Sequence, residues 1–422
     1  MIYALILFAI TYVLMLTFSK YRPYIALASA LVFILTGMLP LDQIFTAIDW
    51  NVLLMIAGTM GLVQLFIDSH MPARLADMIM TKVPNVQMAA VALALFAGII
   101  SAFVDNVATV LMVAPVALAI CKKLNTNPVP FIIGIAVSSN LQGAATLVGD
   151  TTAIMLGSYA DMSFLDFFWY KGRPGIFFAV ELGAVASALI LAWLFRKEKK
   201  PIDRATQLTP VTDYVPTVLL AGMIVLLISA SFLPSKPDIT NGLICVTLFV
   251  IGMVYTYVRT RKTEAFTGPI KSIDFETIGL LLGLFLVIGG ITHMGVVDAA
   301  AGLLAKMGGG NVFLIYTVIV WASVLFSAFI DNIPYVAKML PVVTGLASTL
   351  GIDPTLLYFG LLSGATLGGN MTPIGASANI AGIGILRREG YEVKTGDFCR
   401  IGIPFTLAAV IPAYIYFWVL FA

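Results

Sequence analysis

Residues 101–106 read SAFVDN, and residues 327–332 read SAFIDN. Each copy places an Asp-Asn pair inside a long apolar run, and the two pairs lie 226 positions apart. A carboxylate surrounded by hydrocarbon is costly unless it is paired or coordinated. The repeated hexapeptide therefore predicts a polar site that the chain builds from two related parts.

The composition is typical of a polytopic membrane protein. Of the 422 residues, 60% are hydrophobic and only 11% are charged, and the mean hydropathy is +1.00. Soluble domains carry roughly 25% charged residues. The net charge of +2 gives no reason to expect a nucleic-acid partner. We expect the chain to lie in a lipid bilayer, in a prokaryotic inner or plasma membrane.

Eight plain apolar segments are long enough to cross a bilayer as helices. A spanning helix needs about 20 apolar residues, and the segments that meet this requirement are 2–19, 23–40, 50–68, 174–195, 214–233, 239–258, 273–292 and 401–421. Two further stretches, 86–158 and 311–386, are apolar but contain Asp, Asn, Pro and Gly. We predict an all-α membrane protein in which these two stretches hold irregular helices.

The two interrupted stretches repeat without insertion or deletion. Three residues of the first recur 226 positions later in the second: Asp105 as Asp331, Pro115 as Pro341, and Gly149 as Gly375. Upstream, IDWNVLLMIAG at 48–58 matches IDFETIGLLLG at 273–283. The sequence thus predicts an internal duplication, with a first repeat over 1–196, a cytoplasmic linker over 197–213 and a second repeat over 214–422.

Lysine and arginine in short loops indicate how the repeats are oriented. With the linker in the cytoplasm, most of the 24 basic residues fall on the cytoplasmic side. Each repeat then crosses the membrane five times, and because five is odd, the second repeat runs in the opposite sense. We predict an inverted repeat with both termini outside, as in many secondary transporters.

Each repeat is expected to contain one re-entrant helical hairpin and one broken membrane helix. The hairpins are predicted over 86–124 and 311–350, with the Asp-Asn pairs at their tips, and the broken helices over 129–157 and 354–386. Irregular backbone at membrane depth is tolerated only where it is buried in protein or lines a water-filled cavity. The two tips approach from opposite sides, so we expect them to meet near the midplane.

Oxygen ligands gather at these tips and breaks. The predicted breaks fall at Gly143, Gly149, Gly369, Pro373 and Gly375. The side chains expected to bind the ion or substrate are Asp105, Asn106, Asn140, Thr146, Asp150, Thr151, Asp331, Asn332, Asn370, Thr372, Ser377 and Asn379. Glycine can also serve close helix packing, and serine or threonine can bond the preceding turn. The symmetric occurrence of both clusters beside an acidic tip favours a site.

Four acids are expected at membrane depth. Asp105 and Asp331 are predicted to alternate between a proton and a cation, which is sufficient for antiport. Asp150 breaks the symmetry, because the second repeat has Ala376 in its place. Glu181 is expected to be an interhelical hydrogen-bond partner, with a role in proton relay as the alternative.

Basic residues are expected to contribute little to this centre. Lys338 is predicted either to act as a countercharge, for a carboxylate or an anion, or to extend to the outer interface. No arginine is expected among the central groups, which favours a cation or a neutral solute as the substrate.

Enzyme motifs are missing from the sequence. It contains no HExxH, no GxSxG and no GxxxxGK[ST], so neither a metalloprotease, a hydrolase nor an ATP-driven pump is indicated. We expect a protein that is not an enzyme, with no cofactor and no resident metal. The coupling ion is expected to be H⁺, Na⁺ or both.

The motifs resemble those of the ion transporter superfamily, in the branch that contains arsenite permeases of the ArsB kind, sodium/proton antiporters of the NhaD kind and the melanosomal P protein. The pieces that carry the resemblance are SAFVDNVATVL, NLQGAATLVGDTTAIML, SAFIDNIPYVAKMLPV and LGGNMTPIGASANIAG. The resemblance implies scaffold and transport domains, elevator-type alternating access and a homodimer. Related dicarboxylate carriers have Ser-Asn-Thr at the hairpin tips, which this chain lacks.

The acidic centre and the resemblance together predict proton-coupled transport of a small inorganic ion. Sodium/proton antiport is favoured. Arsenite or antimonite efflux is the first alternative, because LGGNMTPIGASANIAG is more similar to the arsenite permeases and arsenite is largely a neutral solute near neutral pH. An anion or dicarboxylate carrier and an ion channel are the further alternatives.

Overall fold

The computed structural model describes residues 1–18, 21–124, 126–201, 208–233, 237–297, 299, 301–302 and 310–422. Part of the predicted linker, residues 202–207, therefore lies outside the described residues. The elements of the first half are α1 (Ile2–Thr17), α2 (Arg22–Leu35), η2 (Leu41–Gln43), α3 (Ile44–Ala47), α4 (Trp50–Asp68), α5 (Met71–Met80), α6 (Val86–Ser101), α7 (Asn106–Leu124), α8 (Val129–Gly143), α9 (Thr151–Tyr159), η3 (Leu165–Phe167), β1 (Trp169–Tyr170), β2 (Arg173–Pro174) and α10 (Ile176–Leu194).

The second half is built in a similar way. Its elements are α11 (Val215–Ser231), α12 (Thr240–Thr260), α13 (Glu264–Ser272), α14 (Phe275–His293), α16 (Val312–Ser327), α17 (Asn332–Leu350), α18 (Thr355–Gly368), η4 (Gly369–Met371), α19 (Ser377–Arg388) and α20 (Thr395–Phe421). Each of the eight plain apolar segments of the sequence forms a helix. The only β-strands among the described residues form the β1–β2 hairpin, which an all-α prediction misses, and an isolated β-bridge joins Asn85 to Pro201. The turn residues of the hairpin, Lys171 and Gly172, have φ of 49° and 79°.

The helices are suited to a bilayer. Among the described residues, six helices are long and apolar enough to cross a membrane: α4, α10, α12, α14, α17 and α20. The predicted span 23–40 is shorter in the structure, since α2 has 14 residues; the chain leaves the helix before Gly37, which takes a φ of 71°. The protein is a polytopic, mostly helical membrane protein.

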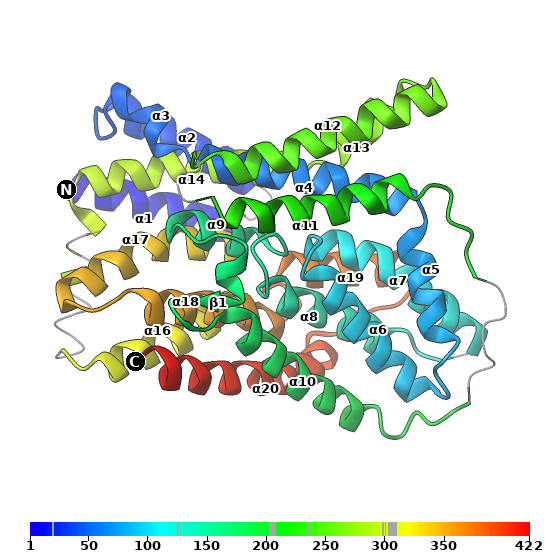
Figure 1. The fold of residues 1–422 in the computed structure, drawn as a ribbon. Helices are drawn as coiled ribbons and strands as arrows, with labels where there is room; N and C mark the ends of the chain where they lie inside the picture. The colour runs from blue at the N-terminus through cyan, green and yellow to red at the C-terminus, as the bar shows by residue number, and fades with distance from the viewer. Residues whose placement is uncertain are drawn as a thin grey trace.

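The helices form two layers, and both halves of the chain contribute to each (Figure 1). The first layer contains α1–α4 and α11–α14, in which α4 packs on α12 and α2 packs on α14. The second layer contains α6–α10 and α16–α20, in which α6 packs on α8, α16 on α18, and α10 on α20. The layers touch mainly where α4 meets α7 and α9 and where α14 meets α17. Both termini lie toward the same end of the molecule (Figure 1).

Equivalent helices in the two halves begin with equivalent side chains. Asp49 caps α4 by accepting the N–H of Val52, and Asp274 caps α14 by accepting the N–H of Thr277. Asn85 and Asn311 cap α6 and α16 in the same manner. Side chains of this kind satisfy N–H groups that a helix leaves unpaired at its start. The duplication seen in the sequence is thus also present in the local structure.

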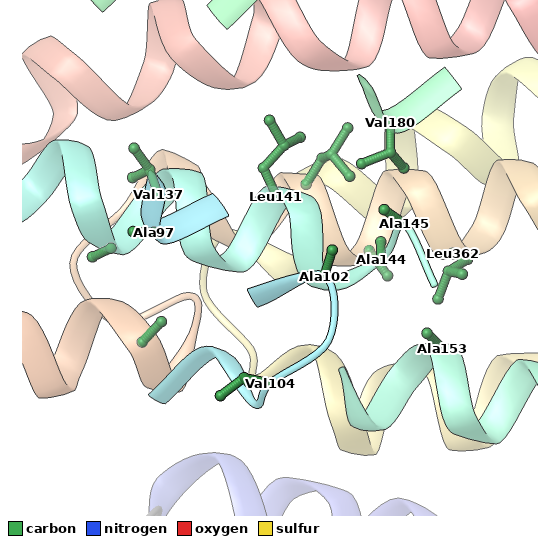
Figure 2. Close-up of a cluster of buried hydrophobic side chains, with 14 of the residues drawn as sticks. Ala97, Ala102, Val104, Val137, Leu141, Ala144, Ala145, Ala153, Val180 and Leu362 are labelled. Atoms are coloured by element: carbon green, nitrogen blue, oxygen red, sulfur yellow. The ribbon is translucent and has the colours of Figure 1, made fainter. Parts of the chain in front are cut away.

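Small side chains let the first hairpin approach the first broken helix closely. Figure 2 shows Ala102 and Val104, on the turn that follows α6, beneath α8 with its Val137 and Leu141. Ala144 and Ala145 continue from the end of α8 in the same cluster (Figure 2), and both are fully buried. Close packing of these side chains holds the hairpin tip against the break in the helix.

Candidate functional site

Both hairpin tips place an aspartate at the start of a helix. The chain turns between α6 and α7 at 102–105, and between α16 and α17 at 328–331. Oδ2 of Asp105 accepts the N–H groups of Val107 and Ala108, both at 3.0 Å. Oδ1 of Asp331 accepts the N–H of Ile333 at 3.1 Å. The helix N-terminus stabilises each carboxylate, and Oδ1 of Asp105 is left for another ligand.

Both broken helices unwind at the predicted glycines. Helix α8 ends at Gly143 and α9 begins at Thr151, while α18 ends at Gly368 and α19 begins at Ser377 after the η4 turn. A Cβ on Gly149 would lie 2.6 Å from the carbonyl oxygens of Gly143 and Ser101. A Cβ on Gly375 would lie 2.7 Å from the carbonyl oxygen of Ser327. Only glycine therefore allows the break to touch the hairpin tip.

Three of the predicted ligands hold the breaks in place. The hydroxyls of Thr146 and Thr372 donate to the carbonyl oxygens of Ala102 and Ala328, at equivalent points of the two hairpins. Nδ2 of Asn379 donates to the carbonyl oxygens of Gly369 and Thr372. These side chains position the unwound backbone. Pro373 lies in the second unwound segment, directly after Thr372.

Buried amides link the two halves. Asn106 donates to Asn140 at 3.1 Å, Asn140 donates to Asn370 at 3.0 Å, and Asn370 donates to the carbonyl oxygen of Val137 at 3.0 Å. A second connection runs through Asp150, whose Oδ2 accepts from Thr152 at 2.6 Å and from Asn332 at 3.5 Å. The tip of the second hairpin thus reaches the break of the first helix.

A cavity of about 320 Å³, here called the tip cavity, opens at this junction. Its lining comprises Met60, Val63, Gln64, Ile67, Asp105, Asn106, Val107, Ala108, Leu111, Met112, Asp150, Thr151, Ser272, Asp274, Thr277, Asn332, Ile333 and Ser377. Three of these residues are aspartates, and none is a lysine or an arginine. Six predicted ligands line the cavity: Asp105, Asn106, Asp150, Thr151, Asn332 and Ser377. Asn140, Thr146, Asn370, Thr372 and Asn379 serve the framework behind it.

A second cavity, of about 820 Å³ and here called the vestibule, lies at the other end of the same helices. The vestibule is lined by Asp49 and Trp50 at the start of α4 and by Thr292 and His293 at the end of α14. The tip cavity instead meets residues 60–67 of α4 and the start of α14. Helix α4 therefore runs from the vestibule toward the tip cavity, and α14 runs the opposite way.

Comparison with known proteins identifies the family of the chain. The family model described as citrate transporter (CitMHS) matches residues 5–264 and 243–422 of the chain. The chain belongs to the citrate transporter family. An uncharacterized transporter of Mycobacterium bovis is 30% identical over 98% of this chain and 97% of its own length. The human P protein is 29% identical over 74% of this chain, and the match covers 46% of that protein.

A solved structure shares the fold. The YdaH transporter of Alcanivorax borkumensis superposes with a TM-score of 0.64 and 15% sequence identity, covering 89% of this chain and 87% of that chain. This citrate transporter family member is accordingly a secondary transporter, and several of its relatives carry the name transporter.

The sequence predicts no arginine among the central groups, and this prediction is wrong. Arg22, at the start of α2, has Nη1 3.8 Å from Oδ2 of Asp331, and the two side chains are only 19% and 13% exposed. The same carboxylate oxygen accepts from Ser377 at 3.0 Å. In the sequence, Arg22 lies between two predicted spans, 2–19 and 23–40, and only the packing of α2 reveals its partner.

The structure also places two other charged residues of the prediction. Lys338 is 8% exposed, and its Nζ has no hydrogen-bond partner among the described residues; it lies 3.7 Å from the ring centroid of Tyr12. Within the described part of the chain Lys338 therefore pairs with an aromatic ring and not with a carboxylate. Glu181, on α10, forms no hydrogen bond or ion pair within the described ranges and lines neither the tip cavity nor the vestibule.

Asp274 is a cavity residue that the sequence analysis does not select. Its signal is the IDW/IDF repeat, which identifies Asp274 as the counterpart of Asp49, a vestibule residue. Over the described ranges, no three His, Cys, Asp or Glu side chains gather closely enough to hold a metal ion. A cation held in the tip cavity would therefore take amide, hydroxyl or carbonyl oxygens in addition to carboxylates.

Proposed function

We propose that this transporter exchanges Na⁺ for H⁺, with the tip cavity as its ion-binding site. The observation that carries the proposal is the charge of the lining: Asp105, Asp150 and Asp274 face the cavity, and no lysine or arginine lines it. An acidic cleft with low-dielectric walls attracts cations and repels anions. A carboxylate that accepts either a proton or Na⁺ couples the two ions by competition.

The ligands for a cation come from both halves of the chain. Oδ1 of Asp105 remains available, because both N–H groups of the tip bond to Oδ2. Thr151 and Ser377, at equivalent starts of α9 and α19, contribute hydroxyl groups to the lining. Asn332 adds an amide beside Asp150. Such a set of carboxylate, hydroxyl and amide oxygens suits a hard monovalent ion.

We further propose that the two halves form an inverted repeat and that alternating access occurs by an elevator movement of one layer against the other. In it, α1–α4 and α11–α14 form the scaffold, and α6–α10 with α16–α20 form the transport domain. The opposite running directions of α4 and α14 between the two cavities support the inversion. Arg259, Arg261 and Lys262 precede α13, and Lys271 lies in its last turn. The last residue of α13, Ser272, lines the tip cavity. Basic residues favour the cytoplasm, so the tip cavity is assigned to the cytoplasmic side and both termini to the outside.

Two other substrates are compatible with part of the site. Neutral arsenite or antimonite would find hydroxyl and amide partners in Asn106, Thr151, Asn332 and Ser377, which agrees with the sequence resemblance to arsenite permeases. The family description names citrate, a multiply charged anion. A free tricarboxylate would need basic partners, and Arg22 is one candidate, although its guanidinium is paired with Asp331.

A proton-flux assay in proteoliposomes tests these assignments. Vesicles carrying an imposed pH gradient are challenged in turn with Na⁺, Li⁺, arsenite, antimonite and citrate, and proton movement is followed with a fluorescent dye. We expect dissipation of the gradient by Na⁺, with a response in Asp150→Asn only at higher Na⁺ concentrations and an unchanged response in Glu389→Gln, which alters a half-exposed residue outside the cavity. A response to citrate or arsenite alone would reassign the substrate.

A further inference from the structure

The second hairpin is attached to the first layer by two charge contacts, and within the described residues the first hairpin has no equivalent of either. Arg22 on α2 pairs with Asp331, and Lys338 on α17 lies over the ring of Tyr12 on α1. The repeat positions show the asymmetry directly. Lys338 corresponds to Met112, 226 positions earlier, and Met112 lines the tip cavity.

We propose that Arg22 acts as a tethered substitute for the transported cation, pairing with Asp331 and holding the empty transporter in the conformation in which the tip cavity is open. This inference rests on the proposed alternating access. Arg22 and Tyr12 belong to the first layer, whereas Asp331 and Lys338 belong to the second. Both contacts must therefore break when one layer slides past the other.

The charges around Asp331 explain how an ion would release the Arg22–Asp331 pair, here called the latch. Arg22 pairs with Asp331 at the start of α17, Lys338 lies two turns further along the same helix, and all three side chains are at most 19% exposed. Asp331 does not itself line the tip cavity, but its Oδ2 accepts from Ser377, which does. A cation that passes from the cavity to Asp331 displaces the guanidinium and leaves like charges facing one another. Repulsion between partly buried like charges is strong, because water screens them poorly. Loading of Asp331 would thus convert an attraction between the layers into a repulsion.

A pair of equivalent residues reports the conformation. Leu111 is 50% exposed and lines the tip cavity, whereas Ala337, its counterpart 226 positions later, is 3% exposed. A change to the conformation in which the tip cavity is closed would bury position 111. It would also open position 337 toward the vestibule, which Ala337 already borders. Cysteines at these two positions should therefore change their reactivity in opposite directions.

The test measures maleimide labelling of Leu111→Cys and of Ala337→Cys in purified protein, in choline buffer without Na⁺. The half-buried native Cys399 is replaced by serine, and the buried Cys121 and Cys245 are retained. Arg22→Gln and Asp331→Asn should each raise the labelling rate at position 337 about 3- to 10-fold and lower it at position 111. In the double variant Arg22→Gln/Asp331→Asn, the two labelling rates should change no more than in either single variant.

Two control variants separate a latch from general loosening. Arg259→Gln removes an ion pair with Asp213 inside the first layer and should leave both rates unchanged. Arg22→Lys keeps the charge and should stay within about twofold of the parent. If Arg22→Gln does not fold, Asp331→Asn decides alone. A rate at position 337 within twofold of the parent in every folded variant would overturn the latch, while Na⁺/H⁺ exchange by the parent protein would leave the proposed function intact.

Discussion

Asn140 and Asn370 join the two broken helices through a hydrogen bond of 3.0 Å, from Nδ2 of Asn140 to Oδ1 of Asn370. Both side chains are fully buried. Asn140 also accepts from Asn106 at the first hairpin tip and donates to the carbonyl oxygen of Thr366 on α18. One amide thus connects the tip and the break of the first half to the broken helix of the second.

Replacing Asn140 by alanine should destabilise the protein. The amide of Asn106 and the oxygen of Asn370 would each lose a partner inside the protein, at a cost of about 1–3 kcal/mol per group. We expect a clear drop in the melting temperature in detergent, measured by tryptophan fluorescence. Asn127→Ala, at an exposed asparagine that accepts a single N–H bond, should lower it much less. Equal melting temperatures for the two variants would contradict the bridging role of Asn140.

Alanine at Gly149 or Gly375 should separate the broken helices from the hairpin tips. Each new methyl group would collide with backbone carbonyl oxygens of the hairpin, and overpacking of this kind costs about 1–3 kcal/mol. Transport should fall in both variants, together with thermal stability. Gly384→Ala is the matched control, because this glycine lies in α19 with no neighbour within 4 Å of the new methyl. It should be neutral or stabilising by up to about 1 kcal/mol.

The sequence predicts the helices and the breaks well, because apolar length and glycine act locally. SAFVDN and SAFIDN are tips in the structure, and Gly149 and Gly375 lie at the unwound segments as expected. Contacts between the halves are harder to foresee. Asn140 bonds to Asn370, although its counterpart by the 226-residue offset is Thr366, so the repeat does not indicate which residues face each other.

Arg22 illustrates a second limit of the sequence. Its position after an apolar segment is typical of a loop cation, and nothing near it in the chain indicates an aspartate more than 300 positions away. The pairing depends on how α2 packs against α14 and reaches the second hairpin. Long-range charge contacts of this kind follow from tertiary packing, which composition and periodicity do not encode.

Lys338→Met should make the protein more stable. The ammonium is buried without a hydrogen-bond partner among the described residues, and the Tyr12 ring offsets only part of that cost. Methionine, the residue found at the equivalent position 112, fills a similar volume without a charge. We expect a melting temperature higher by a few degrees, equivalent to about 1 kcal/mol or more. A lower melting temperature would mean that the charge itself stabilises this conformation.

Asp150→Asn should weaken cation binding without unfolding the protein. Asparagine keeps the size of the side chain and can still accept from Thr152, which bonds Oδ2 at 2.6 Å, but it removes one of three carboxylates from the tip cavity. The KM for Na⁺ should rise about tenfold or more, a loss of about 1.4 kcal/mol. Asp353→Asn, at an aspartate whose side chain is 55% exposed, should leave the KM unchanged. An unaltered KM in Asp150→Asn would remove Asp150 from the binding site.

The most direct test of the central claim is ²²Na⁺ uptake into proteoliposomes that are acidic inside, comparing the parent protein with Asp105→Asn. Asp105 lines the tip cavity, so the claim requires its carboxylate to exchange a proton for the ion. The parent should accumulate ²²Na⁺ while the interior becomes more alkaline. In Asp105→Asn, whose folding is checked by size-exclusion chromatography, the rate of ²²Na⁺ uptake should fall at least about tenfold. An equal rate in Asp105→Asn, or parent protein that moves no ²²Na⁺ under this gradient, would contradict the proposal.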